Sequence, residues 1–255
     1  MFINEKLVYL AFLKSGCTHV LKLLASIPDL DGKVIGKHNS IYDIDKKELN
    51  NFSQKIKSGN IRNPWDWYVS LWAFSCMQRG GLFTHTAKKN ILRKLKHPKT
   101  FFTSAKDWQK VYSDPEDPEL FKKWLEMLLC TRRKDIACFG DTTKIIGYMT
   151  YKYFELYTYN FKKAFKTIRT YEQLSGFDQQ NNFIDFFITS ENLENDFRLL
   201  MIKTGIQKEV IDNVLNIPKT NPSQRKHYRD YYNNDLIELV REKDKLIIEK
   251  HNYNF

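Results

Sequence analysis

A short apolar run near the start of the chain constrains the fold more than any other feature. Residues 7–13 (LVYLAFL) are continuously apolar, with the length and composition of a buried strand in a parallel sheet. The polar residues 14–19 (KSGCTH) follow at once, and residues 20–27 then carry Val, Leu and Ile at helical spacing until Pro28. This pattern predicts a strand, a tight glycine-containing turn and a helix.

Strands and helices are expected to alternate along the rest of the chain. Residues 34–38 are a weak strand candidate, and Pro64 suits the first position of a helix, where its missing N–H has no intrahelical partner. We expect Gly80 and Gly81 to end that helix and residues 82–115 to be basic and irregular. The other expected elements are a polar helix at 45–57, an amphipathic helix from Asp117-Pro118, a Tyr-rich helix at 142–159, a strand at 184–189, and helices from Glu191 to Gly205, at 207–215 and at 235–251.

Alternating strands and helices with an excess of helix predict an α/β fold of three layers around a small, mostly parallel central sheet. We expect a single domain over residues 1–255, with a helical and basic insertion at about 80–160. No apolar stretch reaches the ~20 residues that cross a bilayer, and the N-terminus lacks the residue order of a signal peptide. The sequence therefore predicts a soluble, cytoplasmic protein without a membrane span.

The charge balance favours anionic partners. The chain has 41 Lys and Arg against 30 Asp and Glu, a net charge of +11, which suits nucleic acid, phosphorylated cofactors or acidic glycans without choosing among them. The four cysteines form no CxxC pair and do not cluster with histidines at metal-ligand spacing. They are expected to be free thiols, and no zinc site is expected. Those cysteines are Cys17, Cys76, Cys130 and Cys138.

The turn at residues 14–19 is a candidate anion site. A helix N-terminus presents free backbone N–H groups and the positive end of the helix dipole, which phosphate and sulfate groups bind. Lys14 adds a full charge, and Ser15 and Thr18 add hydroxyls. The order is not that of a Walker A loop, because Lys14 precedes Gly16 instead of following a second glycine. The alternative is an ordinary strand–helix turn with a solvated lysine.

Arg62 and Ser70 form a second candidate pair. Pro64 places Ser70 nearly two turns into the following helix, so both side chains can reach one anion if that helix starts beside the first turn. An arginine grips a phosphate with two parallel N–H bonds, and a serine adds a third donor. The alternative interpretation is a capping arginine and a core serine.

Together these segments resemble the family of sulfotransferases that depend on 3′-phosphoadenosine-5′-phosphosulfate (PAPS). Residues 14–19 are similar to the family's KSGTTW or KTGGTS loop, and residues 62–70 to its RNPxDxxxS segment. Residues 191–197 resemble the ENLxxDF that follows a strand. The end of the chain resembles that of the bacterial and Golgi carbohydrate sulfotransferase branch, at Asn221, Tyr231-Tyr232 and the closing residues 252–255. Cys17 and His19 depart from the loop pattern, and residues 57–60 are less apolar than the family's strand.

The resemblance implies a P-loop-NTPase-like fold, transfer of a sulfuryl group from PAPS to a hydroxyl, and adenosine 3′,5′-bisphosphate as the product. Lys14 would stabilise the leaving oxygen, and the backbone of Ser15, Gly16, Cys17, Thr18 and His19, with the Thr18 hydroxyl, would cradle the 5′-phosphate. Arg62 and Ser70 would hold the 3′-phosphate. By position alone, two residues of a later loop would close over the nucleotide: Arg225 and Lys226. The acceptor is expected to be a carbohydrate or another hydroxyl compound, anionic ones included, without metal.

The general base is predicted to be His38, which follows a short apolar stretch between the two cofactor segments in a context similar to the KHxS of bacterial relatives. A neutral imidazole accepts an alcohol proton near pH 7. Glu48 and then His19 are the rivals, and a strand-end histidine bonded to the backbone is the structural alternative. The Trp residues at 65, 67 and 72 are interpreted as core, and the basic residues from Lys88 to Lys99 as a solvated face that would otherwise suit an anionic acceptor.

Three other interpretations are kept. A nucleotide kinase would need Walker A order and Mg²⁺-binding acids, which the sequence lacks. A basic nucleic-acid or polyanion-binding protein without catalysis would explain the charge, but the basic residues are scattered and the Trp residues do not accompany them, so no nucleic acid is expected. A non-catalytic relative of the sulfotransferases is the third, raised by Cys17.

Overall fold

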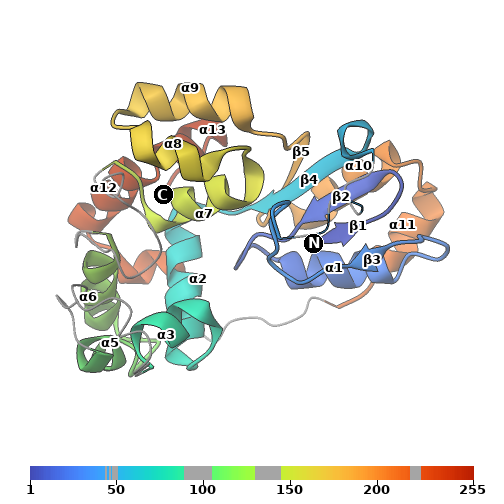
Figure 1. Cartoon of the computed structure of the whole chain (residues 1–255). Coiled ribbons are helices and arrows are strands. Elements are labelled where there is room, and N and C mark those ends of the chain that lie inside the picture. Colours follow the sequence, from blue (N-terminus) through green and yellow to red (C-terminus); the bar gives the residue numbers. More distant parts are fainter. Residues whose placement is uncertain (44, 46, 48–50, 89–104, 130–144, 219–224) are drawn as a thin grey trace. The chain divides into compact units, whose positions relative to one another are not determined.

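The structure is a computed structural model that describes residues 1–43, 45, 47, 51–88, 105–129, 145–218 and 225–255 (Figure 1). The chain divides into two compact units. The first, the sheet unit, consists of Met1–Asn63, Lys152–Phe161 and Asp178–Pro222. The second, the helical unit, consists of Pro64–Tyr151, Lys162–Phe177 and Ser223–Phe255.

The sheet unit is built on a five-stranded sheet of order β3-β1-β2-β4-β5. β2 pairs in parallel with β4 and β4 with β5, whereas β1 is antiparallel to both β2 and β3. The α/β class is confirmed, but the sheet is mixed, not mostly parallel. The reason is the short link from β1 to β2, because strands joined by a tight turn pair antiparallel. The strands are β1 (Phe2–Ile3), β2 (Leu7–Leu10), β3 (Lys33–Val34), β4 (Ile56–Ile61) and β5 (Phe186–Thr189).

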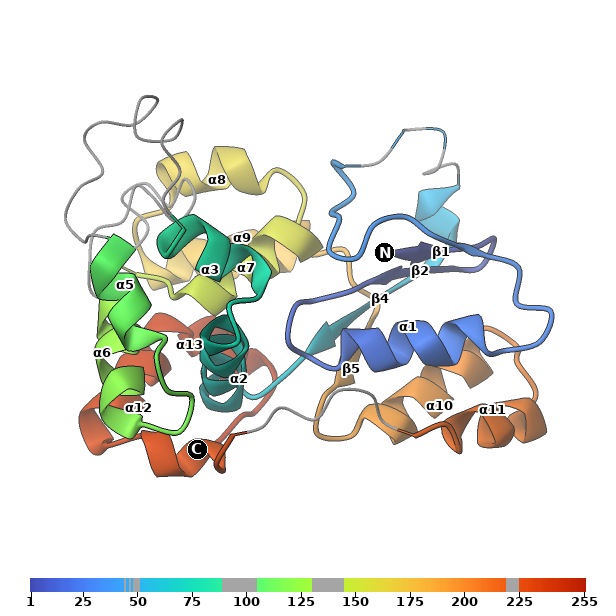
Figure 2. The same cartoon turned by 90° about the horizontal axis from the view of Figure 1, so that it is seen from below.

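Helices cover both faces of this sheet, as the alternation of side chains along a strand requires. On one face, Leu7, Tyr9 and Ala11 join a buried core with residues of α1 (Cys17–Ala25), α10 (Leu193–Lys203) and α11 (Lys208–Leu215), which lie together in Figure 2. On the other face, the ring of Tyr157 stacks on Phe12 and meets Phe187 edge-on. Tyr157 ends α7 (Tyr148–Tyr157), whose residues from Lys152 on belong to the sheet unit.

β4 is a central strand although its sequence is polar. Ser58 and Asn60 are fully buried, and the Asn60 side chain accepts a hydrogen bond from the hydroxyl of Tyr9. On the opposite face, the Tyr157 hydroxyl donates to the Asn60 carbonyl at 2.7 Å. A Cβ at Gly59 would lie 2.5 Å from the Tyr157 ring. Position 59 therefore needs a glycine so that α7 can approach the sheet.

We expect Gly59→Ala to lower the free energy of unfolding by about 1–3 kcal/mol, the usual cost of overpacking a core. The Tyr157 ring is held by its hydrogen bond and by Phe12, so it cannot move aside freely. Urea unfolding measures the loss. Gly176→Ala is the matched control, since nothing lies within 4 Å of a Cβ there and alanine favours the helix. Equal stabilities for the two variants would contradict this packing.

The helical unit packs around α2 (Pro64–Cys76). Trp72 is fully buried against Phe121 and Tyr231, and its indole N–H donates to the Val111 carbonyl at 2.8 Å. Trp65 and Trp67 are also buried, which confirms the prediction that these tryptophans belong to the core. The other elements outside the sheet are α3 (Gly80–Thr86), α5 (Ala105–Val111), α6 (Pro118–Leu129), α8 (Phe161–Thr167), α9 (Tyr171–Asn181), α12 (Asn234–Lys243), α13 (Lys245–Lys250) and the 3₁₀ turns η2 (Phe52–Gln54) and η4 (Tyr228–Tyr231).

Asp244 is a buried carboxylate at the junction of α12 and α13. It accepts hydrogen bonds from the Tyr68 hydroxyl at 2.6 Å and from the backbone N–H and hydroxyl of Thr150 at 2.8 and 2.7 Å. Thr150 lies in the first turn of α7, so Asp244 satisfies an N–H that the helix itself leaves unpaired. Burial raises the pKa of Asp244 to about 6, against the lowering effect of these hydrogen bonds.

Several predicted elements are confirmed: the strand, turn and helix at the start, the helices from Pro64 and Pro118, β5, α10 and α11. Others are wrong. The predicted polar helix at 45–57 runs into strand β4, the predicted irregular segment contains α3 and α5, and the helix from Pro64 ends at Cys76, with Gly80 opening α3. The predicted last helix is two helices, because the chain turns at Asp244 to bury its carboxylate.

Candidate functional site

The predicted anion-binding turn lies between β2 and α1 in the sheet unit. Lys14 has a φ of 59° and Gly16 a φ of 80°, so the backbone passes twice through the left-handed region. A Cβ on Gly16 would also meet Leu193 at 2.6 Å, which requires glycine there. The Gly16 carbonyl accepts from His19 N–H at 2.9 Å, which starts α1 without a side-chain cap among the described residues. The first N–H groups of α1 are thus available to an anion.

The side chains of this turn divide into buried and exposed ones. Ser15 is fully buried, and its hydroxyl donates to the Phe12 carbonyl at 2.8 Å, so it shapes the turn. Cys17 and His19 are buried too, and burial raises the pKa of the Cys17 thiol. Thr18 is exposed, and Lys14 is half-buried. Lys14 and Thr18 therefore have the side chains that can reach a ligand, while Cys17 contributes only its backbone N–H group and the His19 N–H is bonded to the Gly16 carbonyl.

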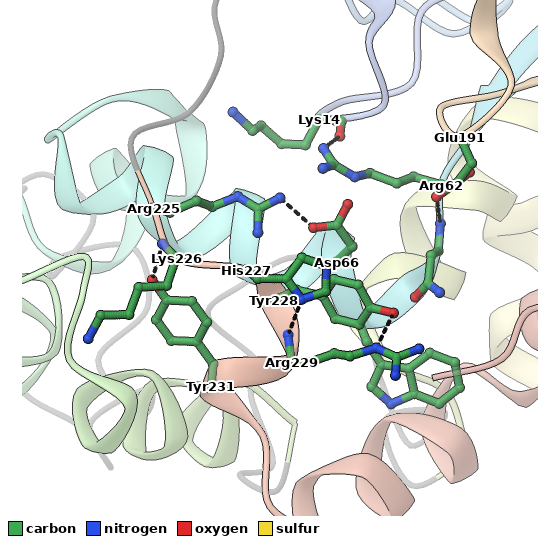
Figure 3. Close-up of polar contacts among 12 residues, drawn as sticks. Lys14, Arg62, Asp66, Glu191, Arg225, Lys226, His227, Tyr228, Arg229 and Tyr231 are labelled. Atoms are coloured by element: carbon green, nitrogen blue, oxygen red, sulfur yellow. Dashed lines mark hydrogen bonds and ion pairs between the residues drawn. The ribbon is translucent and has the colours of Figure 1, made fainter.

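Arg62 lies beside this turn because of strand pairing. It follows β4, whose carboxyl end is next to that of β2 in the parallel pair. Its guanidinium donates to the Lys14 carbonyl at 2.9 Å (Figure 3). Lys14 and Arg62 are both predicted site residues, and the structure brings them together within the sheet unit.

Glu191 lies just beyond the end of the third parallel strand, β5. Its carboxylate accepts the Asn63 N–H at 2.8 Å, which fixes the backbone just after Arg62 (Figure 3). From the sequence, Glu191 is part of the motif at residues 191–197 and has no predicted role in the site. The signal that could have found it is its position, since polar residues that follow neighbouring parallel strands meet at one edge of the sheet.

His38 also lies beside the turn. Its Nδ1 is 2.8 Å from the carbonyl oxygen of Ala11, the first residue after β2. A carbonyl only accepts, so Nδ1 carries the hydrogen and Nε2 of the neutral ring has a free lone pair. The pKa of His38 is lowered, mainly by burial of the ring, although the residue as a whole is exposed. The positive charge of Lys37 lowers the pKa further. Glu48, the rival base, lies outside the described residues.

The remaining predicted residues lie in the helical unit. Ser70 is buried within α2, one turn after Asp66 and on the same side of the helix. Arg225 forms an ion pair with Asp66 (Figure 3), so it lies near the start of α2. Lys226 donates through its ammonium group to the Glu116 carbonyl at 2.9 Å. Arg225 and Ser70 thus lie on one side of α2. The ammonium group of Lys226 instead contacts the segment just before α6.

Comparison with known proteins identifies no family. No family model, curated protein or solved structure matches the chain. In the part of the chain that the structure describes, no group of His, Cys, Asp and Glu is arranged to hold a metal ion. Over the same residues, no helix has both the length and the apolar character needed to cross a membrane.

Proposed function

We propose that this protein transfers a sulfuryl group from PAPS to a hydroxyl group, with a carbohydrate as the acceptor. The observation that carries the proposal is the hydrogen bond from Arg62 to the Lys14 carbonyl. It joins two cationic residues and an uncapped helix N-terminus at the ends of adjacent parallel strands. A ligand with two separate phosphate groups suits such an arrangement better than a ligand with one.

The donor-binding roles follow from the exposed groups. Lys14, Thr18 and the first N–H groups of α1 would hold the 5′-phosphosulfate, and Arg62 would hold the 3′-phosphate. The resemblance to sulfotransferases in the order of these residues along the chain supports the assignment.

The reaction needs positioning, charge neutralisation and one proton transfer. The acceptor oxygen would attack sulfur in line, forming a new S–O bond while the bridging S–O bond to the 5′-phosphate breaks. Nε2 of His38 would take the hydroxyl proton, and Lys14 would stabilise the negative charge on the departing phosphate oxygen. The products are a sulfate ester and adenosine 3′,5′-bisphosphate. The lowered pKa keeps His38 neutral and ready to accept a proton at pH 7.

Adenosine 3′,5′-bisphosphate should raise the melting temperature of the wild type much more than AMP or ATP does. A ligand at 100 times its Kd stabilises the folded state by about 2.7 kcal/mol. Arg62→Ala should abolish most of this preference, because only the 3′-phosphate is assigned to Arg62. Arg198→Ala is the control, since Arg198 pairs with Asp212 and has no assigned role in donor binding. Equal shifts for AMP and the bisphosphate in the wild type would remove the 3′-phosphate site, and with it the proposed donor.

A further inference from the structure

The segment at residues 191–197 follows β5 and has no part in the proposed donor site. Two of its carboxylates, those of Glu191 and Asp196, accept backbone N–H groups near the carboxyl ends of β4 and β5. Both residues belong to the sheet unit, as Arg62 does. A carboxylate close to a site built from positive charge needs a reason, because it opposes the binding of an anion.

Asp196 fixes the shape of this segment from within. Its Oδ2 accepts the N–H and the hydroxyl of Thr189 at 2.8 and 2.6 Å, and its Oδ1 accepts the side-chain amide of Asn192 at 2.9 Å. Thr189 is the last residue of β5, and Asn192 precedes the first residue of α10. The two residues between them, Ser190 and Glu191, therefore form a short link that is tied at both ends.

This link binds β4 on both sides of Arg62. The N–H and the hydroxyl of Ser190 donate to the Ile61 carbonyl at 2.9 and 3.2 Å. The Glu191 carboxylate accepts the Asn63 N–H at 2.8 Å (Figure 3). Because Ile61 and Asn63 are the residues just before and just after Arg62, the backbone from which the arginine extends is held from both directions.

The side chain of Arg62 is held at its far end as well. Its Nη1 donates to the carbonyl of Lys14, whose φ of 59° sets the direction of that carbonyl. A guanidinium has five N–H donors in a rigid plane, so a bond from one of them orients the others. An arginine fixed at its backbone and at its guanidinium loses little conformational entropy when it binds a phosphate.

We propose that Glu191 is a positioning residue for Arg62, and that it sets the preference of the site for a nucleotide with a 3′-phosphate over one without it. The carboxylate acts through the backbone by accepting the Asn63 N–H, and it does not contact the nucleotide. Asn63 is only 8% exposed, so an N–H that loses this acceptor is costly and the backbone beside Arg62 shifts. The identity of the anion rests on the proposed function, whereas the orientation of Arg62 by Glu191 does not depend on a ligand.

The test compares calorimetric affinities for adenosine 3′,5′-bisphosphate and for AMP. Glu191→Ala should weaken binding of the bisphosphate about tenfold and leave AMP binding unchanged, because only the 3′-phosphate is assigned to Arg62. Glu191→Gln keeps an oxygen that can accept the Asn63 N–H, so it should retain the preference. Glu194→Ala is the matched control, since it removes the same charge from the first turn of α10.

A double-mutant cycle shows whether Glu191 acts through Arg62. The double variant Arg62→Ala, Glu191→Ala should bind the bisphosphate as weakly as Arg62→Ala alone, because the arginine that Glu191 orients is then missing. The proposal is overturned if the two losses add, if Glu191→Ala weakens AMP and the bisphosphate equally, or if Glu191→Gln loses the preference as Glu191→Ala does.

Failure of the proposed function is visible separately, because the wild type would then bind AMP and the bisphosphate equally. In that case NMR on the ligand-free protein decides the role of Glu191. Glu191→Ala should speed hydrogen exchange of the Asn63 N–H and shift the Nε–H signal of Arg62, and Glu191→Gln should do neither. Unchanged exchange and an unchanged Arg62 signal in Glu191→Ala would overturn the positioning role.

Discussion

His38→Ala should lower kcat by about 10²- to 10⁴-fold, the usual cost of losing a general base, and leave affinity for adenosine 3′,5′-bisphosphate nearly unchanged. The physical reason is the Nδ1 bond to the Ala11 carbonyl, which leaves Nε2 as the proton acceptor beside the turn. Turnover with a working acceptor and calorimetry with the bisphosphate make the comparison. A collapse of affinity along with turnover would mean that His38 supports the nucleotide site instead.

His38→Asn separates a base from a structural residue. The amide can donate to the Ala11 carbonyl as the ring does, but it cannot accept the proton, so this variant should be as slow as His38→Ala. The pH profile gives a second measure. Because burial lowers the pKa of His38 below its ordinary value of 6.5, the wild-type rate should be level at pH 7 and fall only as the ring is protonated at lower pH. Full turnover in His38→Asn would exclude His38 as the base.

Asp244→Ala should lower the free energy of unfolding by about 2–5 kcal/mol, the largest stability loss we expect from one substitution. The substitution removes the acceptor of two Thr150 donors and of the Tyr68 hydroxyl inside a buried site. Donors left without a partner there cost about 1–3 kcal/mol each, and the N-terminal turn of α7 is among them. Urea unfolding at pH 7 measures the effect.

Asp244→Asn is the informative control, because its amide oxygen can still accept from Thr150 without a charge. The folded-state pKa of Asp244 is raised from 3.8 to about 6, so its stabilising contribution is complete below pH 3.8 and is lost as the pH rises to about 6. Relative to Asp244→Asn, the wild type should therefore lose about 3 kcal/mol between pH 4 and 7. A pH-independent difference between the two proteins would show that the carboxylate is not buried in this way.

Local patterns predicted the start of the sheet unit and failed at β4. The first strand, turn and helix are encoded by neighbouring residues, namely an apolar run, a glycine with positive φ and a helical apolar stripe. β4 has no such pattern, since Ser58 and Asn60 are buried and the partner of Asn60 is Tyr9, distant in the chain. Hydrophobic periodicity cannot reveal a strand with buried polar side chains, one of which is bonded to a residue distant in the chain.

In the candidate site, too, some residues could be predicted from local sequence and others could not. Lys14 and Gly16 could be selected from sequence because they follow a recognisable strand, and Arg62 because it comes just before the helix that Pro64 begins. The contact between Glu191 and Asn63 depends on the pairing of β4 with β5, which no local feature specifies.

The pairing of β4 with β5 also means that the sheet cannot be completed until late in synthesis. These strands are neighbours, yet the hydrogen bond from Lys57 N–H to Asp185 joins residues 128 positions apart. During synthesis, β2 and β4 leave the ribosome long before β5, and most of the intervening residues belong to the helical unit. Such distant pairing makes folding slow and leaves one edge of β4 open to wrong partners in the meantime. The nascent chain is therefore most exposed to aggregation between the emergence of β4 and that of β5.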